Sequence, residues 1–337
     1  MTKIHRAVVR VVAALALLAV FTGPAVQAGE QQKEELYGMV VFLKGSEFFN
    51  WCYAGFKDAA ATVGPHVKTE YLGPADWDAS AEAKAIEQLI AKQARGIAVT
   101  AGDADTLVGA INKSIDAKIP CLTFDSDSPK SRRLLFVGTD SYQSGYEAGL
   151  IIAEELGDDA RIGISLIPGL DSITHRVAGF TAALKEKAPG ASIVAQVNDE
   201  GDINKAEQVI TAMLQANPEI NSIFCAHGNP ATGAMKAVIN VGRDMGPNKV
   251  HVMAYSIDVP ILEAVENDEL MGTVAQLPYL MGVVSFWNLY SAAHPTQFDN
   301  PGYPGFGMVP TANIDTGAVV LRKGDPLLQY LKNPPKM

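Results

Sequence analysis

Three aromatic residues, Phe48, Phe49 and Trp51, lie where an apolar segment changes into a helical pattern. The segment that begins at Leu36 is rich in β-formers and has the length of a buried parallel strand, and Lys44-Gly45-Ser46 ends it. Because ligands bind at the carboxyl ends of the strands in an open α/β sheet, we expect these aromatics to border a ligand site. The alternative for each ring is packing of the helix on the sheet.

The elements that position these residues alternate between strand and helix. In the first half, strands are expected at Val67–Leu72, Gly96–Thr100, Ile119–Phe124 and Leu134–Val137, with helices at Ala83–Ala94 and Thr106–Ala117. This rhythm indicates βαβ units and a mostly parallel sheet, and right-handed crossovers make the sheet doubly wound. Asp125-Ser126-Asp127 follows the fourth strand directly.

The same pattern restarts after a helix at Tyr142–Leu156. Strands are expected at Arg161–Ile167, Ser192–Val197, Ser222–Ala226, Val250–Tyr255 and Gly272–Ala275, and polar turns at His227-Gly228-Asn229 and Ser256-Ile257-Asp258 follow two of them. The sequence therefore predicts two five-strand α/β halves in tandem. A helix at Pro278–Ala293, a Pro/Gly-rich stretch at Pro295–Pro310 and a strand-like run at Ala318–Leu321 belong to neither half, which is typical of a chain that crosses between two domains more than once.

Residues 1–28 have the features of an export signal. Lys3, Arg6 and Arg10 precede an apolar core at Val11–Phe21, and Val26-Gln27-Ala28 forms a small-residue cleavage motif. The apolar core is shorter than the about 20 residues that span a bilayer. We expect cleavage after Ala28 and export into a bacterial periplasm, with a retained membrane anchor as the alternative.

Charge and composition exclude some functions. The formal net charge is −10, which opposes binding to the phosphate backbone of nucleic acids. Cys52, Cys121 and Cys225 each lie in an apolar pattern and are expected to be buried fillers, and no Cys/His spacing supports a metal site. Asp199-Glu200-Gly201-Asp202 faintly resembles a calcium loop, but it lacks the terminal Glu, so we expect it to cap the next helix.

Five segments resemble the periplasmic sugar-binding proteins of ABC transporters, of the ribose-binding-protein type. They are the strand–FF–helix opening at Ser46–Gly55, IPCLTFDSDSP, FVGTDSYQSGYEAG, NPATGAMKAV and TVAQLPYLMG. The resemblance to this type I periplasmic binding protein family covers nearly all of Leu36–Leu331. It implies two Rossmann-like lobes, residues 36–138 plus 277–307 and residues 139–276 plus 308–337. Three hinge crossings, near Gly138-Thr139-Asp140, Gln276 and Gly307, would join them around a buried ligand.

The resemblance also implies residue roles. Phe48 and Phe49 match the stacking aromatics, Asp125 the acid that binds hydroxyls, Arg176 the arginine donor and Gln276 the hinge glutamine. A buried polyol needs such donors and acceptors, and its C–H faces favour aromatic walls. Capping of a turn is the alternative for Asp125, and a solvated helix position is the alternative for Arg176.

The chain departs from the family pattern at three strand ends. Ser126 and Asp127 stand where ribose-binding proteins have an arginine after the acid, and His227-Gly228-Asn229 replaces an Asn-Asp pair. Ser256 replaces an acid, with Asp258 two residues later. Further candidates for ligand contact are therefore Asp127, His227, Asn229, Ser256 and Asp258. His227 either hydrogen-bonds to a ligand hydroxyl or hydrogen-bonds within its own turn. The departures support another pentose, a hexose, an inositol or a sugar alcohol at least as well as ribose.

The implied function is that of a monomeric periplasmic receptor that captures a sugar or polyol for an ABC permease, without catalysis, cofactor or nucleic acid. GxGxxG, GxxxxGK[ST] and GxSxG motifs are absent at the strand–helix turns, which argues against nucleotide binding and serine hydrolysis. An enzyme of the same shape, a ligand-loaded partner of a membrane sensor or chemoreceptor, and a LacI-type regulator are the alternatives. The regulator would need a basic helix-turn-helix where the export signal stands.

Overall fold

A computed structural model describes residues 33–168, 170–228, 230–245, 250–294 and 312–333. Within these residues the strands form two six-stranded sheets. The first has the order β11 (Ala312–Asp315), β5 (Leu135–Gly138), β4 (Cys121–Phe124), β3 (Gly96–Val99), β1 (Glu35–Val40) and β2 (Val67–Leu72). The second has the order β12 (Ala318–Leu321), β10 (Gly272–Gln276), β9 (His251–Ala254), β8 (Ser222–Cys225), β6 (Arg161–Leu166) and β7 (Ser192–Asn198). β12 runs antiparallel to β10, whereas β4 pairs parallel with β3 and β8 pairs parallel with β6.

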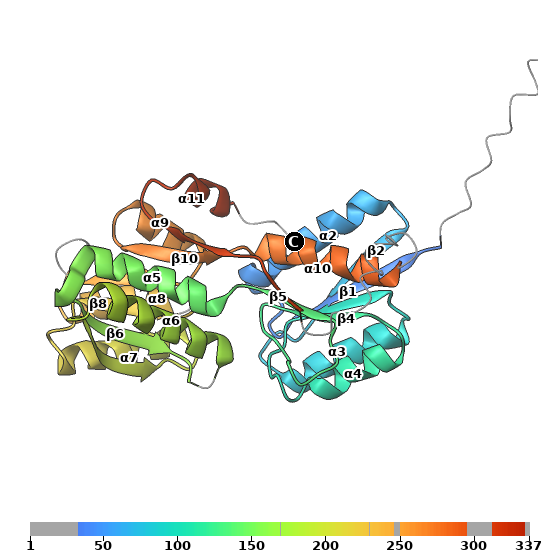
Figure 1. Ribbon diagram of the computed structural model, residues 1–337, viewed down its shortest axis with the longest axis horizontal. Helices are drawn as coiled ribbons and strands as arrows, with labels where there is room; N and C mark the ends of the chain where they lie inside the picture. Colours follow the sequence, from blue (N-terminus) through green and yellow to red (C-terminus); the bar gives the residue numbers. More distant parts are fainter. Residues whose placement is uncertain (1–32, 169, 229, 246–249, 295–311, 334–337) are drawn as a thin grey trace, which may run out of the picture. The chain divides into compact units, whose positions relative to one another are not determined.

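The first sheet and the helices packed on it form the first lobe. Helices α2 (Glu47–Val63) and α10 (Pro278–Ala293) cover one face, and α3 (Ala79–Ala91) and α4 (Val108–Asp116) cover the other (Figure 1). Successive side chains of a strand point to opposite faces, so Tyr37 packs with Phe56 and Phe286 while Val40 packs with Ile86. Both faces of the sheet are buried at its centre, which explains why β3 and β4 are mostly apolar and fully buried rather than alternating.

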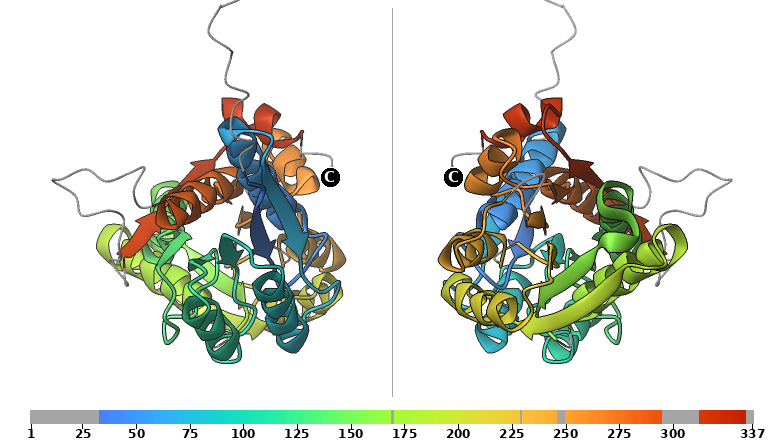
Figure 2. Two further views of the ribbon diagram at one scale, coloured as in Figure 1. Left: turned by 90° about the vertical axis from the view of Figure 1, so that its right-hand side faces the viewer. Right: turned by 90° about the vertical axis from the view of Figure 1, so that its left-hand side faces the viewer.

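The second lobe repeats this arrangement around the second sheet. Helices α5 (Ser141–Leu156) and α6 (Asp171–Lys187) cover one face. The other face carries α7 (Ile203–Ala216), α8 (Pro230–Asn240), α9 (Val259–Glu266) and α11 (Pro326–Leu331), and the end-on views show helices on both sides of the sheets (Figure 2). The predicted fold class of two doubly wound, parallel-sheet α/β lobes is confirmed, because both faces of each sheet must be covered when βαβ units build it.

Close helix packing fixes the position of α6. A Cβ added to Gly145 of α5 would lie 2.0 Å from the Arg176 carbonyl oxygen, and one added to Gly179 of α6 would lie 1.9 Å from the Tyr142 carbonyl oxygen. Only glycine permits this approach of two backbones. The helix that carries Arg176 is therefore seated directly on the helix that follows the first crossing between the lobes.

Two predictions about the end of the chain need correction. Each sheet has six strands rather than five, because β11 and β12 add to the edges of the first and second sheets (Figure 1). β11 pairs parallel with β5, so the chain still belongs to the first sheet at Asp315 and enters the second at Ala318. The last crossing therefore lies at Thr316-Gly317 rather than near Gly307, which is outside the described residues.

The predicted signal peptide, residues 1–28, also lies outside the described residues. Among the residues that the structure does describe, none of the helices combines the length and apolar character required to cross a bilayer.

Candidate ligand-binding site

Asp125, Arg176 and Gln276 come together from both sheets. Asp125 follows β4 of the first sheet, Gln276 ends β10 of the second, and Arg176 lies on α6. The Asp125 carboxylate lies close enough to the Arg176 guanidinium and to the Gln276 side chain for both groups to lower its pKa. Thr100 Oγ1 also donates to Asp125 Oδ2, at 3.4 Å. The sequence resemblance pointed to these three residues, and the structure places them in one cluster.

Burial dominates the electrostatics of Asp125. It raises the pKa of this carboxyl to about 6, against the lowering effects of the Arg176 charge and of the bonds from Thr100 and Gln276. The backbone of Asp125 is left-handed, with φ +58°, which a non-glycine residue rarely adopts. A perturbed acid on a strained strand end is the kind of feature that functional sites contain.

Arg176 is almost completely buried, at 7% exposed. Its guanidinium carbon stands 3.9 Å from the centroid of the Tyr255 ring, and Nη1 donates to the Ala226 carbonyl oxygen at 3.1 Å. The hydroxyl groups of Tyr255 and Ser144 lie 2.8 Å apart, which fixes the ring from the α5 side. Nε of Arg176 is buried without a hydrogen-bond partner among the described residues. A buried donor of this kind costs about 1–3 kcal/mol unless a ligand satisfies it, so Arg176 is not the solvated helix residue of the alternative interpretation.

Phe49 packs beside the end of β4, 4% exposed, in the core of the first lobe. Its ring contacts those of Phe42, Phe48 and Phe124, the last at 6.4 Å between centroids, and Phe124 directly precedes Asp125. Phe48 is half-buried and packs against the cores of both lobes. Trp51 instead lies in the core cluster of the second lobe, 5% exposed, with Tyr330 and Tyr279 as ring neighbours. Its ring occupies a packing position.

Trp77 is an aromatic that sequence reasoning missed. It lies between β2 and α3, is 52% exposed, and stacks on Phe42 at 4.7 Å between centroids. Its indole N–H donates to the Gly102 carbonyl oxygen at 3.2 Å. The only sequence signal for Trp77 is its position after the second strand, which places it at the same edge of the sheet as Phe42.

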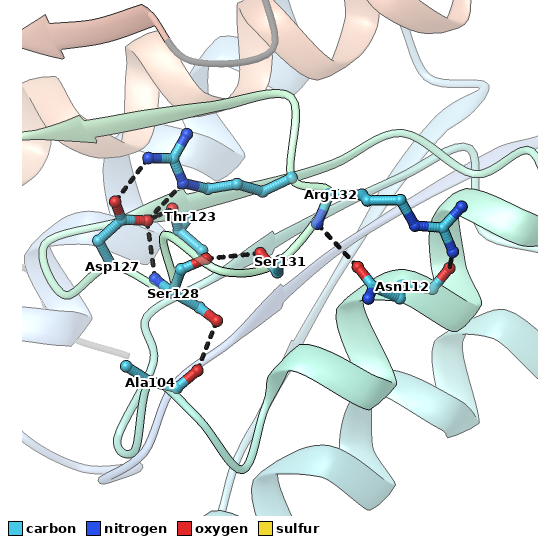
Figure 3. Close-up of polar contacts among 8 residues, drawn as sticks. Ala104, Asn112, Thr123, Asp127, Ser128, Ser131 and Arg132 are labelled. Carbon is cyan, nitrogen blue, oxygen red and sulfur yellow. Dashed lines mark hydrogen bonds and ion pairs between the residues drawn. The ribbon is translucent and has the colours of Figure 1, made fainter.

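Asp127 is occupied by bonds within the first lobe (Figure 3). Its carboxylate accepts from Thr123 Oγ1, from the Ser128 N–H at 2.7 Å and from the guanidinium of Arg133, whose Nη2 lies 2.6 Å from Oδ2. Arg133 is 6% exposed. A nearly buried charge pair is costly to break because it leaves an unpaired ion. The geometry therefore indicates that Asp127 stabilises the loop after β4.

His227 pairs with a buried acid. Its Nε2 lies 2.8 Å from Oδ1 and 3.0 Å from Oδ2 of Asp199, which is completely buried. Ser165 Oγ donates to Asp199 Oδ2 at 2.6 Å. The expectation that the Asp199–Asp202 turn caps a helix holds for Asp202, which accepts from the Lys205 N–H. The role of Asp199 was missed because its partners lie on other strands.

Ser256 and Asp258 lie at the start of α9. Ser256 Oγ accepts from the Asp258 N–H at 3.0 Å, and the Ser256 N–H donates to Thr273 Oγ1, so Ser256 stabilises this turn. Asp258 lies within the field of Glu47, at the start of α2 in the first lobe. Burial first, and the Asp258 charge second, raise the pKa of Glu47. Asn229 lies outside the described residues.

Thr139 connects the three crossings between the lobes. Its Oγ1 accepts from Gln276 Nε2 at 3.1 Å and donates to the Gly317 carbonyl oxygen at 3.3 Å. Asp315 Oδ1 accepts from the Asp140 N–H and the Gly317 N–H. Gln276 therefore links the cluster at Asp125 directly to the segments that join the lobes.

No other feature of the described residues competes with this site. A cavity of ≈ 610 Å³ is lined by Ile90, Arg95, Lys118 and Ala293 among others, and it adjoins the amino-terminal ends of β3 and β4, the opposite edge from Asp125. In the described parts of the chain, no three His, Cys, Asp or Glu residues are grouped to hold a metal ion. All three cysteines are buried free thiols, as their apolar contexts predicted.

Comparison with known proteins supports the family assignment that the sequence segments predicted. The sequence family described as periplasmic binding protein domain matches residues 37–294. The ribose import binding protein of Bacillus subtilis is 24% identical over 252 residues, which cover 74% of this chain and 79% of the relative. The D-allose-binding periplasmic protein of Escherichia coli is 28% identical over 256 residues, 73% of this chain and 80% of the relative.

A solved structure has the same fold over both lobes. AraP, an arabinose binding protein from Geobacillus stearothermophilus, has a TM-score of 0.78 and 28% identity, and the match covers 88% of this chain and 99% of that chain. The matched span reaches from β1 through α10 in sequence and over both lobes in structure. The chain therefore belongs to the family of type I periplasmic binding proteins, as the segments that resemble it predicted.

Proposed function

We propose that this protein binds a sugar or polyol between its two lobes and delivers it to an ABC permease. The observation that carries the proposal is the cluster of Asp125, Arg176 and Gln276, which joins groups from both sheets at the carboxyl ends of their strands. Relatives named for ribose and D-allose, and a structural neighbour named for arabinose, support a sugar as the ligand class.

The cluster suits an uncharged hydroxylated molecule. Each hydroxyl offers one donor and two acceptor positions, so it is best held between a carboxylate and a cationic donor. Asp125 supplies the acceptor, and Arg176 supplies the donor with an unused buried Nε. Phe48 and Phe49 supply apolar surface for the C–H faces of a ring.

The proposed contact set is smaller than the set of sequence candidates. It comprises Phe48, Phe49, Asp125, Arg176, His227 and Gln276. Trp51 is left out because its ring packs in the core of the second lobe, and Asp127 and Ser256 are left out because their polar atoms bond within their own loops. Asp258 and Asn229 stay predictions without a structural argument for ligand contact.

Ligand binding is coupled to rotation of the lobes in this proposal. Contacts from both lobes favour the closed arrangement, and Thr139, Gln276 and Thr316-Gly317 absorb the rotation. Within the described residues, we assign 36–138, 277–294 and 312–315 to the first lobe, and 139–276 and 316–333 to the second. Export by way of residues 1–28 would place the receptor in the periplasm as a monomer that acts without a cofactor and without catalysis.

A thermal-shift screen of residues 29–337 tests the proposal. The panel contains D-ribose, D-allose, L-arabinose, D-galactose, myo-inositol and xylitol. At a ligand concentration of 100 times the Kd, binding stabilises the folded state by about 2.7 kcal/mol. At least one compound should therefore raise the Tm by several degrees in a concentration-dependent manner. A panel without any such shift contradicts the proposal, and recovery of a chemically altered sugar would indicate an enzyme instead.

A further inference from the structure

We propose that Asp199 is a positioning residue that holds His227 as the tautomer with its proton on Nε2. The Nδ1 lone pair then accepts a hydrogen bond from a ligand hydroxyl. This inference rests on the proposed function, because the hydroxyl belongs to the sugar or polyol of that site. It goes further by assigning a direction to one hydrogen bond and a role to Asp199, which does not itself reach the ligand.

Three neighbouring strand ends build the pair. Ser165 lies on β6, Asp199 follows β7 and His227 follows β8, and these strands are adjacent in the order β8-β6-β7. Asp199 and Ser165 are both 0% exposed. The Asp199 carboxylate accepts from Ser165 Oγ at 2.6 Å and from the Gly201 N–H at 2.8 Å.

These contacts determine which ring nitrogen carries the proton. An ionised carboxylate can only accept hydrogen bonds, so the ring atom that faces it must be a donor. That atom is Nε2, which lies 2.8 Å and 3.0 Å from the two oxygens of Asp199. In a neutral imidazole the other nitrogen is then an acceptor, because the partner of one nitrogen decides the state of the other.

The location of His227 makes this acceptor available to the site. The residue before it, Ala226, accepts the hydrogen bond from Arg176 Nη1 at 3.1 Å, so the backbone that leads into His227 lies against the arginine. The His227 side chain is 12% exposed, which leaves part of the ring uncovered while Asp199 is sealed behind it. Arg176 donates and His227 accepts. One hydroxyl of the ligand therefore accepts a hydrogen bond from Arg176, and the adjacent hydroxyl donates one to His227.

The first experiment needs no ligand. Nitrogen-15 NMR of ligand-free protein at pH 8, with the His227 signals assigned from a His227→Ala spectrum, reports which ring nitrogen is protonated. We expect protonated Nε2 and unprotonated Nδ1 in the wild type. In Asp199→Asn, the single amide oxygen takes the Oδ1 position, where the Gly201 N–H requires an acceptor. The NH₂ group then takes the Oδ2 position, where it donates to Nε2 and the Ser165 hydroxyl becomes an acceptor, so the tautomer reverses. A wild-type ring protonated on Nδ1 overturns the inference.

Ser165→Ala is the matched control for this spectrum. It removes one donor to Asp199 but leaves the Asp199–His227 contact in place, so the Nε2–H tautomer should persist. The wild-type spectrum decides the tautomer even if Asp199→Asn does not fold.

The second experiment measures affinity for the panel sugar with the largest thermal shift. Asp199→Asn and His227→Ala should each weaken binding about 10- to 100-fold, as loss of an orienting partner typically does. The double variant should bind no more weakly than His227→Ala alone, because Asp199 acts only through the ring. Full additivity of the two effects, or wild-type affinity of Asp199→Asn, overturns the inference. Asp202→Asn, which retains the helix cap, should bind as the wild type does.

Monodeoxyfluoro analogues of the same sugar test the polarity of the bond. A C–F group cannot donate a hydrogen bond, so one analogue should lose affinity for the wild type but not for His227→Ala. The same affinity loss in both proteins would show that His227 only stabilises its turn. If no panel sugar binds the wild type, both the proposed function and the proposed hydrogen bond from the ligand to Nδ1 are contradicted. The NMR spectrum still decides which tautomer Asp199 stabilises.

Discussion

At Asp125, burial and charge act in opposite directions. Burial raises the pKa to about 6, and this effect exceeds the lowering by Arg176, Thr100 and Gln276. Because the folded pKa is above the ordinary value of 3.8, this group stabilises the ligand-free fold most below pH 3.8. That contribution is lost as the pH rises through about 6. Ligand binding has the opposite preference, since the ionised form is the acceptor for hydroxyls.

Sugar affinity should therefore depend on pH through Asp125. We expect the Kd to rise about tenfold per pH unit as the pH falls well below 6, because only the ionised fraction presents two acceptor oxygens. Isothermal titration calorimetry between pH 4.5 and pH 7.5 measures this. Asp125→Asn should bind weakly with a flat profile, and a wild-type Kd that is constant over this range would contradict the role of Asp125.

Glu82 is a second buried acid, at the first turn of α3, outside the proposed contact set. It is 0% exposed, its Oε2 accepts from the Gly102 N–H at 3.1 Å, and Oε1 lacks a hydrogen-bond partner in the described chain. Burial raises its pKa from 4.5 to about 8. The raised pKa means that its stabilising contribution is present below pH 4.5 and is lost as the pH rises through about 8.

Glu82→Gln should remove this pH dependence. Relative to the wild type, the variant should gain up to about 4 kcal/mol in unfolding free energy as the pH rises from 5 to 8.5. Each unit by which the pKa is raised costs the ionised form about 1.4 kcal/mol, and this pKa is raised from 4.5 to about 8. Urea unfolding at several pH values measures the difference. A difference between the two proteins that stays constant with pH would show that Glu82 does not titrate in this range.

Single residues were predictable from the sequence to different degrees. Asp125 and Gln276 were predicted because each stands in one of the segments that resemble the family, and Arg176 was predicted because it matches the family's arginine donor of the second lobe. Arg133 as the partner of Asp127, and Asp199 as the partner of His227, were not found. Such partners depend on side-chain geometry across a loop or across neighbouring strands, and strand-length patterns carry no information about it.

At the scale of elements, the α5–α6 pair shows how packing positions the site. Gly145 and Gly179 bring the two backbones into contact, and this seats Arg176 next to Tyr255. The strands and helices themselves were predictable because apolar runs and helical spacing mark them. β11 was missed because its four residues, Ala-Asn-Ile-Asp, follow a Pro/Gly-rich stretch and show no apolar run. Its pairing with β5 is a tertiary feature.

Gly179→Ala should destabilise the fold and weaken sugar binding. The new Cβ would lie 1.9 Å from the Tyr142 carbonyl oxygen, so the helices must separate, at a cost of about 1–3 kcal/mol. Gly109→Ala on α4 is the matched control, since its Cβ would meet no atom within 4 Å, and it should leave stability unchanged or slightly raised. Equal unfolding midpoints for the two variants would contradict the packing argument.

At the scale of the whole molecule, the site and the crossings are connected through Gln276 and Thr139. The Gln276 side chain acts on the Asp125 carboxyl and lowers its pKa, Gln276 donates to Thr139, and Thr139 donates to the Gly317 carbonyl oxygen. These residues lie on all three segments that join the lobes. Under the proposed function, a ligand that contacts Asp125 and Arg176 would therefore also affect the residues about which the lobes are proposed to rotate.

Thr139→Val should reduce affinity without unfolding the protein. The substitution keeps the shape but removes both hydroxyl bonds, each worth about 0.5–1.5 kcal/mol, so the sugar Kd should rise roughly 3- to 30-fold. Thr139→Ser retains the hydroxyl and should bind nearly as the wild type does. Calorimetric titration compares them, and a Thr139→Val affinity equal to that of Thr139→Ser would exclude the hydroxyl from the coupling.

The most direct test of the central claim is the sugar-induced Tm shift of Asp125→Asn and Arg176→Ala beside that of the wild type. Asparagine tolerates the left-handed backbone at position 125, and Asp202→Asn serves as the control outside the site. We predict a shift of several degrees in the wild type and the control, and nearly none in the other two. A full shift in both Asp125→Asn and Arg176→Ala would contradict a ligand site built from these two residues.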